Sequence, residues 1–446
     1  MSGRAVSDVD AALSGGPADR ALDAVYRRIT WRVVPILCLG YLVSYIDRVN
    51  VGFAKLQMLG DLHMSEAVYG FGVSLFFITY ILCEVPSNLL LVRTGPRVWL
   101  ARIMISWGAV SACMALVHTP LQFYVCRFLL GAAEAGFLPG VLYYLAGWYP
   151  PHRRARVTAV FMAGIPLSSV LGGPVSGLIL SQLSGKGLAG WQWLFLIEAA
   201  PAVVLGGMIL WLLPRSIEGA NWLTPHEKGL IQADLGASPR EHHGLKEIFQ
   251  TLLDRKVLLM GGINATGLLG VYTIAFWFPS TLKEAGVADP FTIGMLVAVP
   301  NLVAVIALWI NGVHSDRTGE RRWHIAIPML IGAGALALST LAGANVPLVL
   351  GLISIANAGI VGSLGPFWTL PTSLFRGAKA AVSLATVGSI ANVAGFFATA
   401  LVGWVKELTH SSIGVTVVFA GVLAIGAATV ALLPRGLQPT GPRLST

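Results

Sequence analysis

The sequence predicts an all-α membrane protein in which twelve transmembrane helices form two six-helix halves. Of its 446 residues, 55% are hydrophobic and only 11% are charged, whereas soluble domains carry about 25% charged residues. Apolar runs of about 20 residues or more, enough to cross a bilayer, recur along the whole chain. Because water cannot accommodate so much apolar surface, we expect the lipid bilayer to be the solvent of this protein.

Twelve apolar runs correspond to the predicted spans, six on each side of one long polar stretch. The first six cover residues 32–57, 68–92, 97–117, 120–146, 156–182 and 191–213. The second six cover residues 256–283, 291–313, 323–343, 346–370, 379–405 and 412–433. The polar stretch between them is rich in charge and histidine, and we interpret it as a linker.

The predicted organisation has five parts. They are an N-terminal tail (1–31), a first half (32–213), a linker (214–255), a second half (256–433) and a C-terminal tail (434–446). Residues within the first tail form no apolar signal-peptide segment, so the first helix is expected to insert uncleaved. An even number of spans then leaves both tails and the linker on the same side.

The distribution of lysine and arginine indicates which side that is. With the N-terminus in the cytosol, only four of the 30 basic residues fall at outward loops, namely Lys55, Lys186, Lys283 and Lys406. Almost all the others lie on the opposite side, which the positive-inside rule assigns to the cytosol. We therefore expect a multi-pass protein of a bacterial inner (plasma) membrane with both termini cytosolic.

Composition also excludes several partners. The net charge of +9 comes from short basic clusters between apolar runs, which are typical topology signals, so no nucleic acid is expected. The four cysteines lie inside apolar runs without metal-site spacing. His242 and His243 are adjacent in the linker but have no third ligand at a fixed spacing. We expect no metal and no cofactor.

Four ionisable residues inside the predicted spans are the main functional candidates. A charged side chain in mid-membrane costs at least about 2.5–3.5 kcal/mol, so each needs a reason. Asp47 and Arg48 are neighbours near the middle of the first span and point about 100° apart on a helix, so they are not expected simply to neutralise each other. Arg127 and Glu134 lie seven residues apart, close to two helical turns, and share one face.

Several strings give the chain a family resemblance. The string from Gly312 to Arg322, Gly-Val-His-Ser-Asp-Arg-Thr-Gly-Glu-Arg-Arg, follows the eighth span, and a degenerate copy lies at 92–97. It resembles the loop signature of the major facilitator superfamily. Four further strings are similar to the anion:cation symporter family, and this resemblance runs from about Arg28 to Leu433. They are Tyr45-Ile-Asp-Arg-Val-Asn50, Glu84-Val-Pro-Ser-Asn88, Arg127-Phe-Leu-Leu-Gly-Ala-Ala-Glu-Ala-Gly136 and Trp191-Gln-Trp-Leu-Phe-Leu-Ile-Glu198.

The resemblance implies a function and roles for residues. It implies the major facilitator fold and a rocker-type carrier that takes up an organic anion with protons, since bacterial members carry tartrate, phthalate, hydroxyphenylacetate or sugar acids. It assigns proton coupling to Asp47 and Glu134, and substrate binding or gating to Arg48 and Arg127. It makes the loop after the eighth span a gate, with its expected residues Gly312, Asp316, Arg317, Gly319, Arg321 and Arg322.

Other polar and aromatic residues in the spans are candidates to complete a substrate site. Those expected to contribute to substrate binding are Tyr45, Tyr80, Trp277, Asn357, Trp368 and Asn392. Each aromatic residue has an equal alternative as a packing or interfacial side chain. We interpret the remaining buried acids, Glu84 and Glu198, as partners in networks between helices rather than as substrate contacts.

The predicted function is proton-coupled import of a small organic anion, either a hydroxy-dicarboxylate such as tartrate or a sugar acid, by a monomer. An importer of an aromatic carboxylate, and a sodium-coupled or exchange carrier of the same fold, remain open alternatives. An enzyme is not expected, because the chain lacks the HExxH, GxSxG and Walker A motifs. A channel is disfavoured because no ring of selectivity residues is recognisable.

Overall fold

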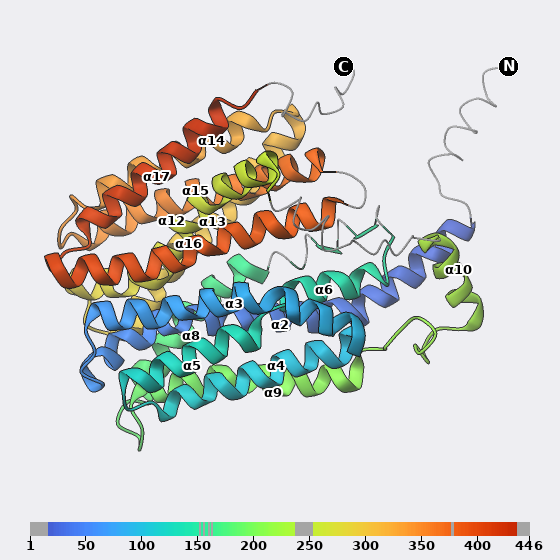
Figure 1. Ribbon diagram of the computed structural model, residues 1–446, viewed down its shortest axis with the longest axis horizontal. Helices are drawn as coiled ribbons and strands as arrows, with labels where there is room; N and C mark the ends of the chain where they lie inside the picture. Colours follow the sequence, from blue (N-terminus) through green and yellow to red (C-terminus); the bar gives the residue numbers. More distant parts are fainter. Residues whose placement is uncertain are drawn as a thin grey trace.

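The computed structural model describes residues 17–150, 153–154, 157–158, 161, 164–236, 253–375 and 379–434. Long helices make up almost all of this part of the chain, and they run back and forth between the two ends of one bundle (Figure 1). Eleven helices among the described residues are long and apolar enough to cross a membrane. The predicted all-α, multi-span fold is confirmed.

The N-terminal half is drawn in blue and green in Figure 1. Its elements are α2 (Pro17–Asp61), α3 (Glu66–Thr94), α4 (Pro96–Cys113), the short 3-10 helix η1 (Met114–Leu116), α5 (Pro120–Glu134), α6 (Phe137–Ala146), α8 (Gly164–Gln182) and α9 (Gly190–Leu212). The predicted fifth span, 156–182, begins before α8 in a segment that lies partly outside the described residues.

The C-terminal half, yellow to red, lies along the first half (Figure 1). Its elements are α12 (Arg255–Glu284), α13 (Pro290–Thr318), α14 (Arg322–Ser339), α15 (Val346–Leu374), α16 (Lys379–Thr409) and α17 (Ile413–Ala431). The described residues of the predicted linker include the helix α10 (Pro225–Leu235). His242 and His243 lie outside the described residues.

Local sequence explains where several of these helices begin. The side chain of Thr119 accepts a hydrogen bond from the backbone N–H of Gln122, and the Gln122 side chain accepts from the Thr119 N–H, which caps α5. The Asp289 carboxylate accepts from the backbone N–H of Thr292 at 2.8 Å and caps α13. These side chains satisfy donors that the first turn of a helix leaves unpaired.

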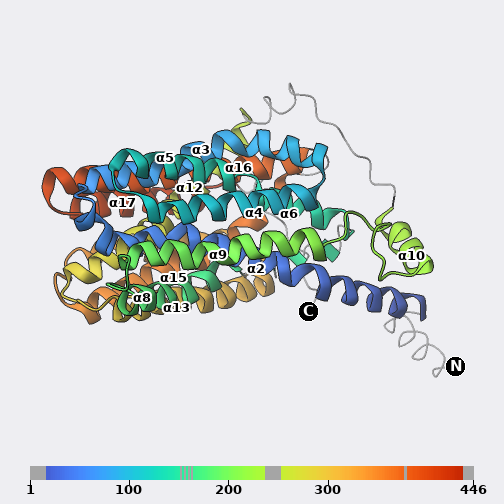
Figure 2. The same ribbon diagram turned by 90° about the horizontal axis from the view of Figure 1, so that it is seen from below.

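The first helix is longer than the sequence predicted. α2 begins at Pro17, within the predicted tail, and its first turns project beyond the bundle beside α10 (Figure 2). Arg28 of α2 forms an ion pair with Glu227 of α10 at 2.9 Å. A search for apolar runs does not find this extension, because its sequence is polar and a helix outside the bilayer does not require apolar residues. We call this end of the bundle the α10 end.

The predicted fourth span, 120–146, is not one continuous helix. α5 ends at Glu134 and α6 begins at Phe137, because Gly136 takes a left-handed backbone conformation with φ of 88°. The Ser87 hydroxyl donates a hydrogen bond to the carbonyl of Ala135 at 2.6 Å, so this carbonyl at the break keeps a partner. The break therefore sits beside one of the predicted functional carboxylates.

Two seams make up most of the contact between the two halves. In one, α3 packs against α16, and in the other α8 packs against α13. Near the opposite end of the bundle, which we call the loop end and define by residues 62–65 and 285–289, the backbones touch. A Cβ atom on Gly70 would lie 2.5 Å from the carbonyl oxygen of Thr399 and 2.9 Å from the Cα atom of Gly403. Only glycine allows this approach.

Charged side chains link the halves at the loop end. Lys55 is 4% exposed and pairs with Glu66 at 2.6 Å, and its ammonium group lies 3.9 Å from the ring centroid of Trp277. Glu66 also pairs with Lys406 of the other half at 3.1 Å, and Lys406 pairs with Glu284. Lys55, Lys283 and Lys406 thus lie within helices rather than in loops. We call these charged residues, Lys55, Glu66, Glu284 and Lys406, the loop-end cluster.

Large apolar side chains cover the outside of the bundle. Trp211, Trp309, Leu341 and Ile425 are each at least 66% exposed, and many more leucine and valine side chains face outward. Exposed apolar surface on this scale is unfavourable in water and fits a lipid-facing surface. The interior, by contrast, contains buried charges, which form the candidate site.

Candidate functional site

An ion pair between α2 and α5 forms the centre of the candidate site. The guanidinium group of Arg48 donates through Nη2 to Oε1 of Glu134, and the hydroxyl of Ser44 donates to the same oxygen at 2.8 Å. Arg48 is 6% exposed and Glu134 is 1% exposed. Each charge is therefore removed from bulk solvent and depends on the other for its stabilisation.

Three aromatic rings surround the guanidinium of Arg48. Its central carbon lies 5.1 Å from the ring centroid of Tyr45, 5.2 Å from that of Phe76 and 5.1 Å from that of Tyr80. Such contacts stabilise a cation through the electron-rich faces of the rings. The site therefore holds a guanidinium with a single carboxylate partner, and Tyr45 and Tyr80, two of the predicted substrate residues, contact that guanidinium.

Asp47, the neighbour of Arg48, takes different partners. The hydroxyl of Ser111 in α4 and the amide Nδ2 of Asn50 both donate to its Oδ1, the latter over 3.3 Å. Its other oxygen, Oδ2, is buried and has no hydrogen-bond partner among the described residues. The two adjacent charges thus point to different helices, as neighbouring positions on a helix require.

Arg127 is completely buried in α5. Its Nη2 donates to the backbone carbonyl of Val73 over 3.5 Å, and its guanidinium carbon lies 5.1 Å from the ring centroid of Phe76. Within the described residues, its Nε and Nη1 atoms have no hydrogen-bond partner. Asp47 and Glu134 both lie within electrostatic range of this group. Two guanidinium groups and two carboxylates therefore share one buried region, and Phe76 contacts both arginines.

The C-terminal half contributes a polar pair to the same region. The hydroxyl of Tyr272 in α12 donates to Oδ1 of Asn392 in α16 at 3.2 Å. The Tyr272 ring packs edge-on against Phe77 of α3, with centroids 4.9 Å apart, and Tyr272 interacts electrostatically with Arg48. The charged cluster of the first half is therefore next to the second half, and the predicted substrate residue Asn392 contacts Tyr272 there.

Three other predicted substrate residues make contacts elsewhere. Trp277 donates to the carbonyl of Ala398 at 3.1 Å and lies under Lys55 of the loop-end cluster. Asn357 donates to Pro300 and Asn301, each at 3.2 Å, which ties α15 to α13 inside the second half. Trp368 is 36% exposed and packs against its neighbour Phe367.

The short loop after α13 forms a compact structure at the α10 end. Gly319 takes a left-handed conformation with φ of 66°, and Asp316 pairs with Arg321 at 2.6 Å. Arg321 also donates to Ser315, whose hydroxyl donates to the carbonyl of Glu320. These contacts join the last turn of α13 to the loop that follows it.

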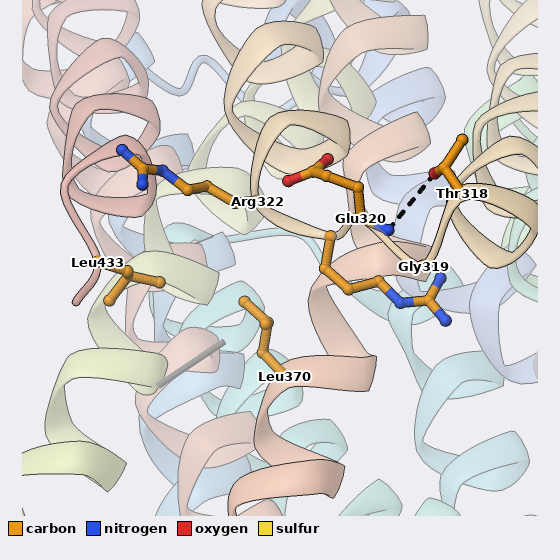
Figure 3. Close-up of a pocket in the computed structure, with 7 residues that line it drawn as sticks. Thr318, Gly319, Glu320, Arg322, Leu370 and Leu433 are labelled. Carbon is orange, nitrogen blue, oxygen red and sulfur yellow. Dashed lines mark hydrogen bonds between the residues drawn. The ribbon is translucent and has the colours of Figure 1, made fainter. Parts of the chain in front are cut away.

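A small pocket of about 170 Å³ lies beside this loop (Figure 3). Its lining residues are Thr318, Gly319, Glu320, Arg321, Arg322, Leu370 and Leu433. Arg317 is in the last turn of α13, Arg322 stacks on Trp323 at 4.9 Å, and Gly312 has open space around its Cα atom. The pocket joins the ends of α13, α15 and α17 rather than the buried charges.

The remaining buried acids lie between helices. Ser176 of α8 donates to Oε1 of Glu198 in α9 at 2.7 Å, and Ser389 of α16 donates to Glu84 of α3 at 2.9 Å. Glu84 therefore belongs to a seam between the halves. Among the described residues, no group of three metal-ligating side chains is present.

Four uncharged residues that were not predicted also contact the charged residues, namely Ser44, Phe76, Ser111 and Tyr272. Serine and aromatic side chains are frequent in transmembrane helices, so their type alone gives no signal. Asn50 carried a usable signal, since it lies three residues after Asp47 and therefore on the same helix face.

The chain is similar in sequence to a known family and to several transport proteins. Residues 37–399 match the Major Facilitator Superfamily. A Pseudomonas putida protein, NicT, whose name refers to metabolite transport, is 49% identical over 94% of this chain and 96% of its own length. An Agrobacterium vitis protein whose name refers to tartrate transport is 44% identical over 92% of this chain and 91% of its own.

The fold has relatives among solved structures as well. A bacterial homologue of the human lysosomal transporter Spinster, in an inward-facing and unoccupied conformation, superposes with a TM-score of 0.70. The two sequences are 17% identical, and the match covers 90% of this chain and 93% of the other. At this identity the likeness concerns the fold.

Proposed function

The chain belongs to the Major Facilitator Superfamily, and on that premise we propose that it is a proton-coupled symporter that imports a small organic anion. The observation that carries this proposal is the buried pair of Arg48 and Glu134, enclosed between helices of the first half and next to Tyr272 of the second. A guanidinium that is already paired with a carboxylate can bind an anion only after that carboxylate is neutralised or displaced.

This pairing provides a route to coupling. When Glu134 takes up a proton, Arg48 loses its counter-charge and its planar fork becomes available to a substrate carboxylate. Arg127 supplies a second guanidinium whose Nε and Nη1 have no hydrogen-bond partner among the described residues. The halves then rock, and loss of the proton on the other side restores the Arg48–Glu134 pair and expels the anion.

The charges of the cluster favour a dianion. Asp47, Arg48, Arg127 and Glu134 carry two negative and two positive charges when all are ionised. Protonation of both acids leaves two positive charges, which a dicarboxylate would neutralise. The relative named for tartrate transport supports the same class of substrate. Tartrate, a hydroxy-dicarboxylate, is therefore the first compound to test, followed by sugar acids.

One observation favours a second candidate. Tyr45, Phe76 and Tyr80 enclose Arg48 with aromatic surface, which could also stack against an aromatic carboxylate. Phthalate and hydroxyphenylacetate therefore belong in the same panel of compounds.

We further propose that the α10 end is cytosolic and that the protein functions as a monomer in the inner membrane. The predicted basic clusters lie at this end, as the positive-inside rule requires. The loop-end cluster and the backbone contacts at Gly70 would then close the outer side. Both halves needed for alternating access are present in one chain.

Uptake into liposomes tests the proposal. The purified protein is reconstituted, an inward proton gradient is imposed, and uptake of labelled tartrate, a hexonate, phthalate and hydroxyphenylacetate is followed. We expect uphill accumulation of one acid, its loss with a protonophore, and its loss in Arg127→Ala. Uptake that ignores the proton gradient would contradict proton coupling while leaving anion transport intact.

A further inference from the structure

Glu198 is a buried carboxyl group to which the proposed cycle of Asp47 and Glu134 assigns no role. It is 5% exposed, lies in the middle of α9 and forms no ion pair among the described residues. Its Oε1 accepts from Ser176 at 2.7 Å, whereas Oε2 is buried without a hydrogen-bond partner in the part of the chain that the structure describes. An ionised carboxylate in such surroundings is strongly disfavoured.

Asn50 connects this carboxyl group to Asp47. Its amide is fully buried, its Nδ2 donates to Asp47 Oδ1 at 3.3 Å, and its side chain also interacts with Glu198. Each of the three side chains keeps one buried oxygen without a partner among the described residues, namely Asp47 Oδ2, Asn50 Oδ1 and Glu198 Oε2. The group lies where α2, α4, α8 and α9 meet, and its member Asp47 is within electrostatic range of Glu134 and Arg127.

The groups around Glu198 favour its protonated form. On α2, the acid Asp47 lies within electrostatic range of Glu198, and on α8 the hydroxyl of Ser176 donates to Glu198. On α4, the hydroxyl of Ser111 donates to Asp47. No lysine or arginine of these helices makes a described contact with Glu198. Two nearby carboxylates in a medium of low dielectric constant do not both remain ionised, and the usual resolution is that one holds a proton.

We propose that Glu198, bridged to Asp47 by Asn50, is a further proton-binding residue of the transport cycle. The inference rests on the proposed function and adds a residue to its proton pathway. It implies that Glu198 gains and loses a proton of its own during the cycle, in addition to the protons of Asp47 and Glu134.

The position of Ser176 indicates how protonation of Glu198 would affect the contact between the two halves. Ser176 precedes Gly177, and a Cβ atom on Gly177 would lie 2.5 Å from the carbonyl oxygen of Pro290 in α13. The hydrogen bond from Ser176 to Glu198 therefore begins one residue away from the α8–α13 seam, along which the halves must move. Protonation of Glu198 weakens its acceptor strength toward Ser176 at that seam.

The first test needs no substrate. Infrared difference spectra of the reconstituted protein are recorded while the pH is changed, and the carbonyl stretch of protonated carboxyl groups is followed. We expect Glu198→Gln to remove one titrating band. Ser176→Ala keeps the carboxyl group but removes its hydrogen-bond donor, so it should shift the frequency of that band. An unchanged set of bands in Glu198→Gln would overturn the proposal.

The second test measures the number of protons moved per tartrate molecule in proteoliposomes. We expect this ratio to fall by one in Glu198→Gln and to stay unchanged in Glu84→Gln, a matched control whose carboxyl group also accepts from a serine. An unchanged ratio in Glu198→Gln would overturn the proposal. If wild-type uptake instead follows a sodium gradient and Glu198→Gln removes that dependence, the proton assignment is overturned.

The two tests separate this inference from the proposed function. If no acid of the panel is taken up with protons but Glu198→Gln removes a titrating band, the proposed function fails and the proton site at Glu198 stands. If uptake is proton-coupled but both the bands and the ratio are unaffected in Glu198→Gln, the inference alone fails.

Discussion

At the scale of single residues, the candidate site depends on charges that have been moved out of water in pairs. Arg48 is stabilised by Glu134 and by three aromatic rings, so removing either charge leaves the other buried alone. Breaking a buried pair in this way destabilises a protein by about 3–5 kcal/mol. The same physical chemistry allows a proton to control whether Arg48 is free to bind an anion.

Arg48→Ala is therefore expected to abolish transport and to lower the stability of the protein markedly. Arg48→Lys keeps the charge but loses the planar fork, so we expect a stable protein with weakened substrate binding. Arg28→Ala is the matched control, since Arg28 pairs with Glu227 at the surface and such pairs contribute about 1 kcal/mol or less. Thermal unfolding in detergent should separate Arg48→Ala from the other two variants, and an unfolding temperature of Arg48→Ala equal to that of Arg28→Ala would contradict this account.

The sequence identified the charged members of the site but not most of its uncharged partners. Asp47, Arg48, Arg127 and Glu134 stand out because a charge in an apolar run is costly. Ser44, Ser111 and Phe76 do not stand out, although they determine which oxygen each acid uses and where each guanidinium lies. Residue type also does not reveal which face of a helix points to the site. Three residues predicted to bind substrate therefore make contacts elsewhere, namely Trp277, Asn357 and Trp368.

At the scale of elements, the break between α5 and α6 positions Glu134, the proposed proton-binding carboxylate. Glu134 is the last residue of α5, and the chain turns at Gly136 while Ser87 binds the carbonyl of Ala135. Trp99 donates to the Ser87 hydroxyl at 3.0 Å and holds it in place. The predicted span 120–146 missed this break because its apolar character continues through it.

Gly136→Ala is expected to destabilise the protein by about 1–2 kcal/mol, the usual cost of a left-handed conformation for a residue with a Cβ atom. That atom would also lie 2.6 Å from Ser87 Oγ. Gly147→Ala serves as control, because Gly147 has a right-handed conformation and its nearest neighbour would lie at 3.4 Å. Thermal unfolding of both variants measures the loss of stability. An equal loss in both would show that the left-handed conformation at Gly136 is not its cause.

At the scale of the whole molecule, two halves close on each other at the loop end. The number and order of the spans could be predicted from apolar runs, because lipid imposes a minimum helix length. The seams between the halves could not be predicted from the sequence. The packing of α3 on α16 and of α8 on α13 depends on small residues, and small residues occur throughout the apolar runs. Lys55 and Lys406 were predicted at outward loops, but they lie within helices and contribute to the loop-end cluster.

Gly70→Val is expected to prevent closure at the loop end, because its side chain would collide with backbone atoms of α16. Spin labels at His63 and His410, in a protein whose native cysteines are replaced, should then move apart. Gly207→Val in α9 is the control, since nothing lies within 4 Å of a Cβ atom there. Unchanged spin-label distances in Gly70→Val would contradict the assignment of this end as the closed one.

The account as a whole depends on Glu134 acting as a proton switch for Arg48. The most direct test compares exchange with net uptake in Glu134→Gln, whose side chain can still accept hydrogen bonds from Arg48 and Ser44. We expect this variant to exchange labelled for unlabelled anion across a liposome membrane but to lose uphill accumulation driven by a proton gradient. Normal uphill accumulation in Glu134→Gln would contradict the central claim.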